Sequence, residues 1–523
     1  MNFLTYNTCT MKLKSLFAAI VLAISLPANA DSAYAHLYEG LQFDMPVIDR
    51  PAFAERTVSI TDFGGVGDGV TLNTDAFAKA IESLASQGGG TLNLPAGVWF
   101  TGPIELKSNI NLHLDRGAIL TFSGDDTLYK MVYVVYEGFE AWRAQSPISG
   151  KDLENVAITG EGVIDGNGSV WRPVRKSQLT GAEWKNYLAK GGIVKEDTWY
   201  PSQSYIDGIP LHEKRAELTR EEAEKVKRYQ RPVMIQLVGC RNVLLEGVTF
   251  QNSPSWNIHP LMCENLIIDN ILVKNPVYAV NGDGLDIESC KNVIIYRSTL
   301  DCGDDAICLK SGKDEAGRRR GIPTENVIVR DCRVFHGHGG FVVGSEMSGG
   351  VANVSVRDCQ FIGTDVGLRF KSTRGRGGVV KNIHIDNVNM LDISGDAITF
   401  DLYYWVFTPV TEIPPVDETT PQFRDIYING VTSRNSGKAL KFNGIPEMPI
   451  ENIHVSNSLF TAREGGLLSE SKEIRFKNVS ITPVSGPAMT INNVTDATFE
   501  GCTFTSPDSD PVIYTGTNKD IHM

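Results

Sequence analysis

The sequence predicts an all-β solenoid, a parallel β-helix. A unit of the form x-Asn-apolar-x-apolar-x-x-apolar-x-apolar recurs along the chain, with the period-2 alternation of short strands. Its asparagines are Asn242, Asn265, Asn292, Asn326, Asn353 and Asn382, which are 23, 27, 34, 27 and 29 residues apart. This spacing lies in the range of solenoid repeats. No unit contains a ten-residue helical pattern, so helical repeat folds are disfavoured.

Composition agrees with a globular chain. The 523 residues are 42% hydrophobic and 21% charged, which excludes a disordered or collagen-like protein. The 49 Lys and Arg against 62 Asp and Glu give a net charge of −13. With this charge and no recognised binding motif, we expect no nucleic-acid partner. A solenoid needs no new core for each repeat, so residues 31–523 are expected to form one domain.

The N-terminus predicts export. Lys12 and Lys14 precede an apolar run from Leu16 to Leu26, and Ala28-Asn29-Ala30 follows. This pattern is typical of a signal peptide, residues 1–30, cleaved after Ala30. Its apolar run is shorter than the roughly 20 residues that span a bilayer, and no comparable run follows. We therefore expect an exported protein without a membrane span, located in the periplasm or outside the cell.

Two regions depart from the repeat. Residues 73–86 combine a capping start, apolar residues on one face and a following Gly88-Gly89-Gly90, which predicts a helix that caps the solenoid. Residues from about 128 to 232 interrupt the strand pattern with aromatic residues and helical patterns near 180–190 and 219–230. An insertion of this length is expected to serve function. Four tryptophans could stack on a ligand there: Trp142, Trp171, Trp199 and Trp256.

Eight cysteines follow the predicted signal peptide, and five of them keep a fixed offset from the repeat asparagines. We interpret them as stacked, mostly unpaired thiols packed as small apolar groups. A disulfide between neighbouring coils remains an alternative that the sequence leaves open. None forms a C-x-x-C pair, which disfavours a zinc site.

Candidate catalytic residues occupy matching positions on four consecutive coils. Asp283 lies 18 residues after its repeat asparagine, Asp304 and Asp305 lie 12 and 13 after theirs, and His338 lies 12 after its own. Arg369 and Lys371 lie 16 and 18 residues after Asn353. Stacked coils would bring these groups together on one lateral face. Asp and Gly also favour tight turns, so each residue alone could be a turn residue, but a turn role explains the shared register poorly.

The spacing suits acid/base chemistry. Carboxylates one or two coils apart would be separated by roughly 5 to 10 Å. A glycosidase that inverts the anomeric centre separates its acid and base by about 6.5–9.5 Å. Basic residues flank the cluster, namely Lys310, Lys313, Arg318, Arg319 and Arg320 on one side and Arg369, Lys371, Arg374 and Arg376 on the other. These cations favour an anionic substrate over a neutral sugar.

At these residues the sequence resembles the polygalacturonases, glycoside hydrolase family 28. Their ordered signatures Asn-Thr-Asp, Gly-Asp-Asp, Gly-His-Gly and Arg-Ile-Lys correspond to Asn281-Gly282-Asp283, Gly303-Asp304-Asp305, Gly337-His338-Gly339 and Arg369-Phe370-Lys371. The likeness covers nearly all of the chain after residue 30 except the 128–232 insertion. Asn73-Thr74-Asp75 also spells the first signature, but its place at a predicted helix start favours a capping role.

The resemblance implies a right-handed parallel β-helix that hydrolyses α-1,4-linked galacturonan with inversion, without a metal or other cofactor. Asp304 would be the general acid, and Asp283 with Asp305 would hold and deprotonate the water. His338 would tune the acid. Arg369 and Lys371 would bind a sugar carboxylate. Asn281 and Arg374 are further candidates for substrate binding.

The expected partner is polygalacturonate or an oligogalacturonide, and the enzyme is expected to be a monomer. Exo action is favoured, because a long insertion near the groove would shape access to it. Endo action remains an alternative if the groove is open. Other readings are a calcium-dependent pectate lyase, whose carboxylates would hold the metal, and a non-catalytic carbohydrate-binding β-helix.

Overall fold

The computed structural model describes Met1 and residues 33–406 and 412–523. The predicted signal peptide therefore lies outside the described residues, apart from Met1. Within the described part of the chain, no helix combines the length and apolar character needed to cross a membrane.

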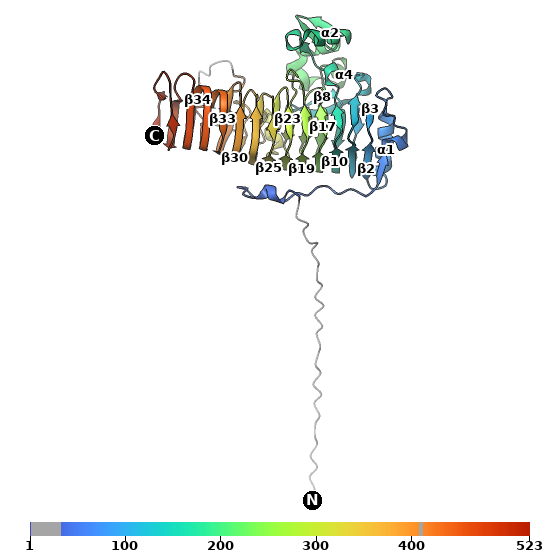
Figure 1. Ribbon diagram of the computed structural model, residues 1–523, viewed down its shortest axis with the longest axis horizontal. Helices are drawn as coiled ribbons and strands as arrows, with labels where there is room; N and C mark the ends of the chain where they lie inside the picture. Colours follow the sequence, from blue (N-terminus) through green and yellow to red (C-terminus); the bar gives the residue numbers. More distant parts are fainter. Residues whose placement is uncertain (2–32, 407–411) are drawn as a thin grey trace.

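The chain winds into a parallel β-helix with three faces, seen side-on in Figure 1. Every strand pair in its main sheet is parallel, and successive strands of one face come from successive coils. The predicted all-β fold is confirmed. The first face contains β1 (Thr57–Ser59), β2 (Gly90–Leu94), β5 (Ile110–Leu114), β10 (Glu154–Gly160), β16 (Arg241–Glu246), β19 (Glu264–Asp269), β22 (Lys291–Tyr296), β25 (Thr324–Arg330), β28 (Val351–Ile362), β30 (Val379–Leu391), β32 (Gln422–Asn429), β34 (Ile450–Pro483), β35 (Met489–Glu500) and β38 (Lys519–His522).

The other two faces complete each turn, and the long strands of the last coils bend from one face to the next. The second face contains β3 (Gly97–Thr101), β6 (Ala118–Phe122), β11 (Val163–Asp165), β17 (Thr249–Gln251), β20 (Leu272–Lys274), β23 (Thr299–Asp301), β26 (Arg333–Val334) and β36 (Thr503–Phe504). The third face contains β4 (Ile104–Glu105), β9 (Ile148–Lys151), β15 (Ile235–Val238), β18 (Ile258–Leu261), β21 (Leu285–Glu288), β24 (Asp305–Lys310), β27 (Gly339–Gly344), β29 (Leu368–Lys371), β31 (Asp396–Asp401), β33 (Thr432–Asn443) and β37 (Val512–Thr515).

The repeat asparagines form a hydrogen-bonded ladder along the solenoid. Each adopts a left-handed backbone conformation, as at Asn265 with φ of 58°, which Asn tolerates better than most residues. The side-chain amide of Asn265 donates to Asn242 at 3.0 Å, and Asn292 donates to Asn265 at 3.1 Å. The ladder continues from Asn109 through Asn382. The repeat asparagine is therefore required both by the turn and by its neighbours on the adjacent coils.

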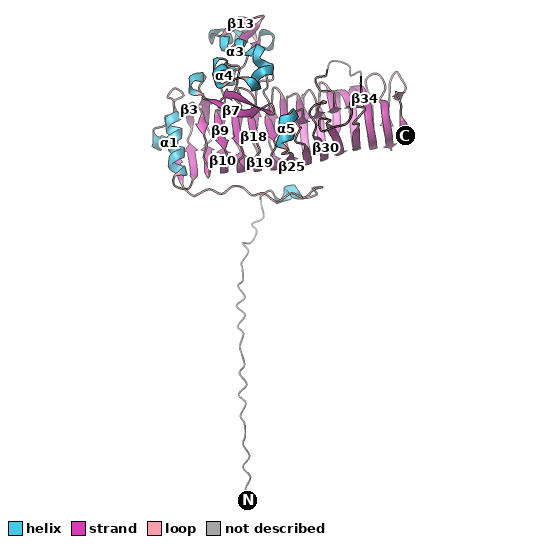
Figure 2. Ribbon diagram, turned by 180° about the vertical axis from the view of Figure 1, so that it is seen from behind, coloured by secondary structure: helices cyan, strands magenta, loops and turns pink. Residues whose placement is uncertain are grey.

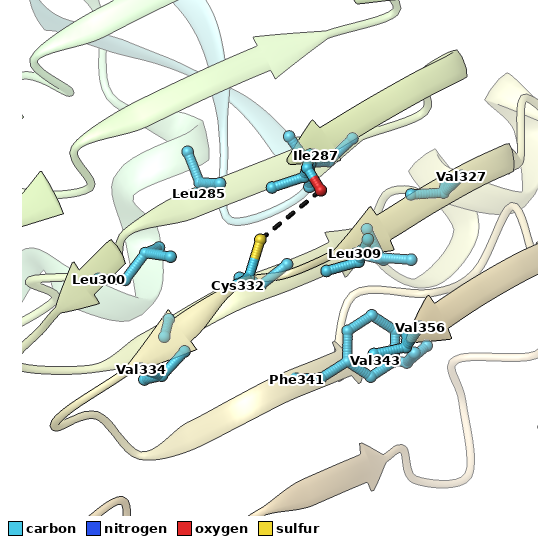
Figure 3. Packing of buried hydrophobic residues seen from close by; sticks show 14 of the residues in the cluster. Leu285, Ile287, Leu300, Leu309, Val327, Cys332, Val334, Phe341, Val343 and Val356 are labelled. Atoms are coloured by element: carbon cyan, nitrogen blue, oxygen red, sulfur yellow. Dashed lines mark hydrogen bonds between the residues drawn. The ribbon is translucent and has the colours of Figure 1, made fainter. Parts of the chain in front are cut away.

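Apolar side chains of all three faces fill the centre of the coils (Figure 3). Phe370 and Phe400 stack at 4.4 Å between ring centroids. The eight cysteines within the described residues are free, and all but Cys502 are buried. Figure 3 shows Cys332 among Leu285, Leu309 and Val334. This agrees with the interpretation of the cysteines as packed thiols.

A helix covers the N-terminal end of the solenoid, which would otherwise expose apolar surface. Helix α1 (Thr74–Ala85) packs Phe77, Ile81 and Leu84 against the first coil, so the predicted capping helix is confirmed. Asn73 stands before it, but its side chain binds the backbone of residues 66, 71 and 100 rather than capping the helix.

A strap, defined here as residues 33–53, precedes the first strand and runs along the first face (Figure 1). It includes the short 3-10 helix η1 (Ala35–Tyr38). The strap buries Tyr34, Leu37 and Ile48 against outward-facing side chains of five coils, which are Ala157, Leu244, Ile267, Ile294 and Ile328. Tyr34 donates a hydrogen bond to Asp269 at 3.1 Å. The strap thus ties coils that are remote from it in sequence.

The stretch expected as one insertion consists of two excursions separated by a complete coil, β9–β11. The first excursion contains η3 (Asp126–Leu128) and an antiparallel hairpin, β7 (Met131–Tyr136) and β8 (Phe139–Ala144). The second protrudes from the solenoid (Figure 2). It contains η4 (Gly168–Val170), β12 (Val174–Arg175), η5 (Lys176–Gln178), α2 (Gly181–Ala189), β13 (Ile193–Lys195), β14 (Thr198–Tyr200), α3 (Gln203–Gly208), η6 (Ile209–Glu217) and α4 (Arg220–Lys225). The remaining helices are η2 (Ile60–Phe63) and α5 (Asp314–Arg320).

Candidate active site

The predicted site residues meet where four adjacent strands of the third face begin. Asp283 precedes β21, Asp304 precedes β24, Asp305 is the first residue of β24, and His338 precedes β27. Arg369 and Lys371 lie in β29. Strand β24 pairs with both β21 and β27, and β27 pairs with β29, so these residues lie on adjacent coils. In register, Asp305 is opposite Gly339, whereas Arg369 and Lys371 are opposite Val342 and Gly344, and their long side chains reach Asp305 from there.

Three carboxylates share one small volume. One oxygen each from Asp283, Asp304 and Asp305 lies within 4.8 Å of the others. This distance is at the short end of the range expected from the coil spacing. The reason is that Asp304 and Asp305 are consecutive residues, and Asp283 lies only one inter-strand step, about 4.8 Å, away from them.

Asp305 is held by two cations. Its Oδ2 accepts a hydrogen bond from Lys371 Nζ at 2.6 Å, and its Oδ1 accepts one from Arg369 at 3.3 Å. Burial opposes ionisation of this carboxyl, but Lys371 and Arg369 outweigh it and lower the pKa of Asp305. Asp305 is therefore a fixed anion whose oxygens already have partners.

Asp304 is bonded to the imidazole of His338. Its Oδ1 faces His338 Nδ1 at 2.9 Å and accepts the backbone N–H of Asp305 at 2.9 Å. The hydrogen bond that the Asp304 carboxylate accepts from His338 outweighs burial and raises the pKa of His338. Both contacts use Oδ1, which leaves Oδ2 as the oxygen that can carry a proton toward a ligand. Asp304 is also the most exposed of the three carboxylates, at 21% of its side chain.

Asp283 is in the opposite environment. Its side chain is almost fully buried, and its Oδ1 has no hydrogen-bond partner among the described residues. Burial, followed by the negative charges of Asp286 and Asp304, raises the pKa of Asp283 well above its ordinary value. A buried carboxylate oxygen with an unused lone pair is suited to bind water and to accept its proton.

The three aspartates, His338 and Lys371 line a pocket of about 550 Å³, whereas Arg369 is not among its lining residues and contacts Asp305 instead. Asn281 and Tyr404 also border it, and the two excursions contribute Glu137, His212 and Glu213. The groove along the third face is therefore bounded at the end nearer the N-terminus by these three residues, Glu137, His212 and Glu213, which we call the wall. The expectation that the insertion lies beside the site holds for the tip of the hairpin and for η6.

The hairpin is fixed against the catalytic coils. Glu137 and Gly138 have φ of 52° and 81°, the signature of a two-residue type I′ turn. A Cβ on Gly138 would lie 2.5 Å from the backbone nitrogen of Lys313, so only glycine permits this close approach. Tyr136 packs on Trp256 with ring centroids 4.5 Å apart. Together these contacts hold the hairpin tip in place beside the pocket.

A second contact ties the end of the second excursion to the site. Arg231 donates to the side-chain oxygen of Asn281 at 2.7 Å and to the carbonyl oxygen of Val280 at 2.7 Å. Arg231 is 7% exposed. The excursion thus orients the turn that carries Asp283.

Some predicted residues lie elsewhere. Arg374 is not among the pocket-lining residues, because its guanidinium binds the Glu447 carboxylate and lies over the Tyr403 ring. Arg376 borders the pocket instead. Trp171 and Trp199 are buried in small cores of the excursions, where they cannot stack on a ligand. The sequence reasoning missed Glu137, His212 and Glu213, since neither excursion carries the repeat register that identified the other site residues.

A parallel β-helix whose pocket gathers three carboxylates, an imidazole and a lysine has the chemical groups of a carbohydrate-active hydrolase. Comparison with known proteins identifies the family. The profile of glycosyl hydrolases family 28 matches residues 216–466. A probable polygalacturonase of Vitis vinifera is 30% identical over 456 residues, covering 85% of this chain and 81% of the relative. The exo-poly-alpha-D-galacturonosidase of Dickeya chrysanthemi is 28% identical, covering 84% and 74%.

A solved structure gives the same result. The hyperthermoactive exopolygalacturonase of Thermotoga maritima superposes with a TM-score of 0.70 at 34% identity, covering 83% of this chain and 93% of that one. The chain belongs to glycosyl hydrolases family 28 and is a glycoside hydrolase of the polygalacturonase type.

Proposed function

We propose that this protein hydrolyses the α-1,4 bonds of polygalacturonate or oligogalacturonides from one chain end, with inversion at the anomeric carbon. The observation that carries the proposal is the walled pocket, which three carboxylates and Lys371 line together with Glu137, His212 and Glu213 of the two excursions. A groove closed at one end accommodates a chain terminus but not the middle of a polymer.

The proposed chemistry follows from the environments of the three carboxylates. Asp304 gives its proton to the glycosidic oxygen as the bond to the anomeric carbon breaks. A water molecule attacks that carbon and loses one proton to Asp283, while the ionised Asp305 accepts a hydrogen bond from the O–H that stays on the water oxygen and orients it. Lys371 and Arg369 neutralise Asp305 and bind the carboxylate of the neighbouring sugar. His338 positions Asp304.

Inversion is supported by the number of carboxylates and by their bonding. Asp305 is already bonded to two cations and is a poor nucleophile, and two anions around one water suit direct attack. The short oxygen separation within 4.8 Å would also suit a retaining enzyme, whose carboxyl groups are about 5–5.5 Å apart. The first anomer released, read by NMR, decides between the two, and we expect β-galacturonate.

We further propose that residues 1–30 direct export and that the mature enzyme begins at Asp31. The charged, apolar and small-residue segments of the N-terminus support this. The N-terminal residue of the exported protein, read by mass spectrometry, checks it.

The test of the main proposal follows products on polygalacturonate with a chelator present. We expect reducing ends to appear as mono- or disaccharide while viscosity stays nearly constant and no unsaturated uronate absorbs. Asp304→Asn should lower kcat by about 10³-fold or more, because protonation of the leaving group is lost. Rapid loss of viscosity would show endo action. Ultraviolet absorbance that depends on added calcium would show a lyase and contradict the proposal.

A further inference from the structure

A nearly buried ammonium group borders the same pocket as the carboxylates. Lys310 ends β24, and its side chain is 4% exposed. Its Nζ donates to Glu346 Oε2 at 3.1 Å and lies 3.5 Å from Asp286 Oδ1. The same nitrogen lies 4.6 Å from the ring centroid of Trp256. The chemistry proposed above gives this cluster no role, although an ion pair this deeply buried is costly to form.

Asp286 is an unusual neighbour for a catalytic base. It is fully buried in β21, and neither carboxylate oxygen has a hydrogen-bond partner among the described residues. It lies three residues from Asp283, whose Oδ1 also lacks a partner. Burial raises the pKa of both carboxyls, and the charge of Asp286 adds to the effect on Asp283. Lys310 acts in the opposite direction on both of them.

Other charges around the cluster are already paired. The groups that face it are Asp304 and Asp305 beside Asp283, Cys308 beside Lys310, and Lys371 and Arg376 beside Glu346. Lys371 is bonded to Asp305, and Arg376 is bonded to Asp314. Burial disfavours the charged form of Lys310, but Cys308, Glu346 and Asp286 outweigh this and raise its pKa. Lys310 therefore stays charged, and it borders the same pocket as Asp283 while lying 3.5 Å from Asp286, which is three residues from Asp283.

We propose that Lys310 is a positioning residue of the hydrolysis: its ammonium, held by Glu346 and Asp286 and covered by Trp256, stabilises the negative charge that Asp283 needs to take a proton from water. This inference rests on the proposed function, in which Asp283 is the base. Asp286 has the opposite effect on Asp283 and serves to hold Lys310 in place. The pKa of Asp283 is thereby set by two opposing charges, because Lys310 lowers it and Asp286 raises it.

Two substitutions should move the pH profile in opposite directions. The acid limb of kcat/KM reports the ionisation of the base in the free enzyme. Lys310→Met removes the cation, so the acid limb should move to higher pH by about one unit or more. At a fixed pH on that limb kcat/KM should fall about tenfold, and it should recover when the pH is raised. Asp286→Asn removes the anion, so the limb should move to lower pH. Lys310→Arg should keep the limb near its wild-type position.

The control is Lys441→Met, which removes a half-buried lysine paired with Asp401 at 2.8 Å, away from the pocket. Its limb should not move. If Lys310→Met does not fold, Asp286→Asn and Lys310→Arg carry the test. The inference would be overturned if the acid limbs of Lys310→Met and Asp286→Asn moved in the same direction, or if neither limb moved. A raised KM with an unmoved limb would also overturn it and would make Lys310 a substrate contact. Wild-type enzyme without hydrolysis of polygalacturonate would instead refute the proposed function.

Discussion

At the scale of single residues, two aspartates in one site have opposite environments. Asp305 lies between Lys371 and Arg369, whereas Asp283 is buried beside other carboxylates without a cation bonded to it. Each is fixed by its neighbours in the β-ladder, because β21, β24 and β29 deliver different charges to adjacent positions. This explains how chemically identical side chains can have pKa values shifted in opposite directions, which the proposed roles of Asp305 and Asp283 require.

The environment of Asp283 should cost stability. Its pKa in the folded protein is above the ordinary value of about 3.9, so the folded state binds more protons and loses stability as the pH rises above that value. Asp283→Asn should therefore raise Tm at pH 7 by about 1–3 °C, and the gain should disappear as the pH falls toward 4. Calorimetry across this range measures it. The exposed Asp510→Asn is the control, and a lower Tm for Asp283→Asn at pH 7 would contradict the argument.

At the scale of elements, the sequence predicts the catalytic coils well and the wall poorly. The repeat asparagine sets a register, so the spacing alone assigns Asp283, Asp305 and Lys371 to neighbouring strands. Glu137 has no such register, since its position depends on how the β7–β8 hairpin folds back on Lys313. Arg374 shows the same limit: its sequence neighbours suggest a cationic patch, but its guanidinium binds Glu447, two coils away, and does not line the pocket.

The hairpin tip offers a test of exo action. Gly138→Val should displace the tip, because the side chain would meet the backbone of Lys313, and so open the pocket. We expect KM for short oligogalacturonides to rise by about tenfold and the loss of viscosity per bond cleaved to increase. Gly191→Val is the matched control, since Gly191 also has positive φ, 81°, but open space around it. If the ratio of viscosity loss to reducing ends stayed unchanged in Gly138→Val, the wall would not be the cause of exo action.

At the scale of the whole molecule, the strap closes a face that the repeat leaves apolar. Leu244, Ile267, Ile294 and Ile328 point outward from successive coils and are buried only because the strap lies over them. The repeat pattern predicts the strands that carry these residues. It does not predict the strap, whose contacts join residues about 200 to 300 positions apart, as Tyr34 and Asp269 illustrate.

Removal of residues 33–53 should lower stability without changing the chemistry. Burial of large apolar side chains contributes about 1.5–3 kcal/mol each, so loss of the strap should lower Tm by about 5 °C or more and allow a hydrophobic dye to bind. The kcat should be retained, because the strap covers the first face and the pocket opens at the third. Tyr34→Phe, which removes the hydrogen bond to Asp269 but keeps the buried ring, should change Tm much less. An unchanged Tm after removal would contradict a stabilising role.

The placement of the second excursion bears on how such enzymes diversify. Strands β11 and β17 pair directly, as do β9 and β15, so the chain leaves the solenoid and re-enters it between coils that are already neighbours. The excursion can therefore change in length or be exchanged without altering the register of the catalytic strands. Access to the pocket can then be varied by grafting, as an antibody framework accepts new loops, provided that Arg231 and its contacts with the turn before Asp283 are kept.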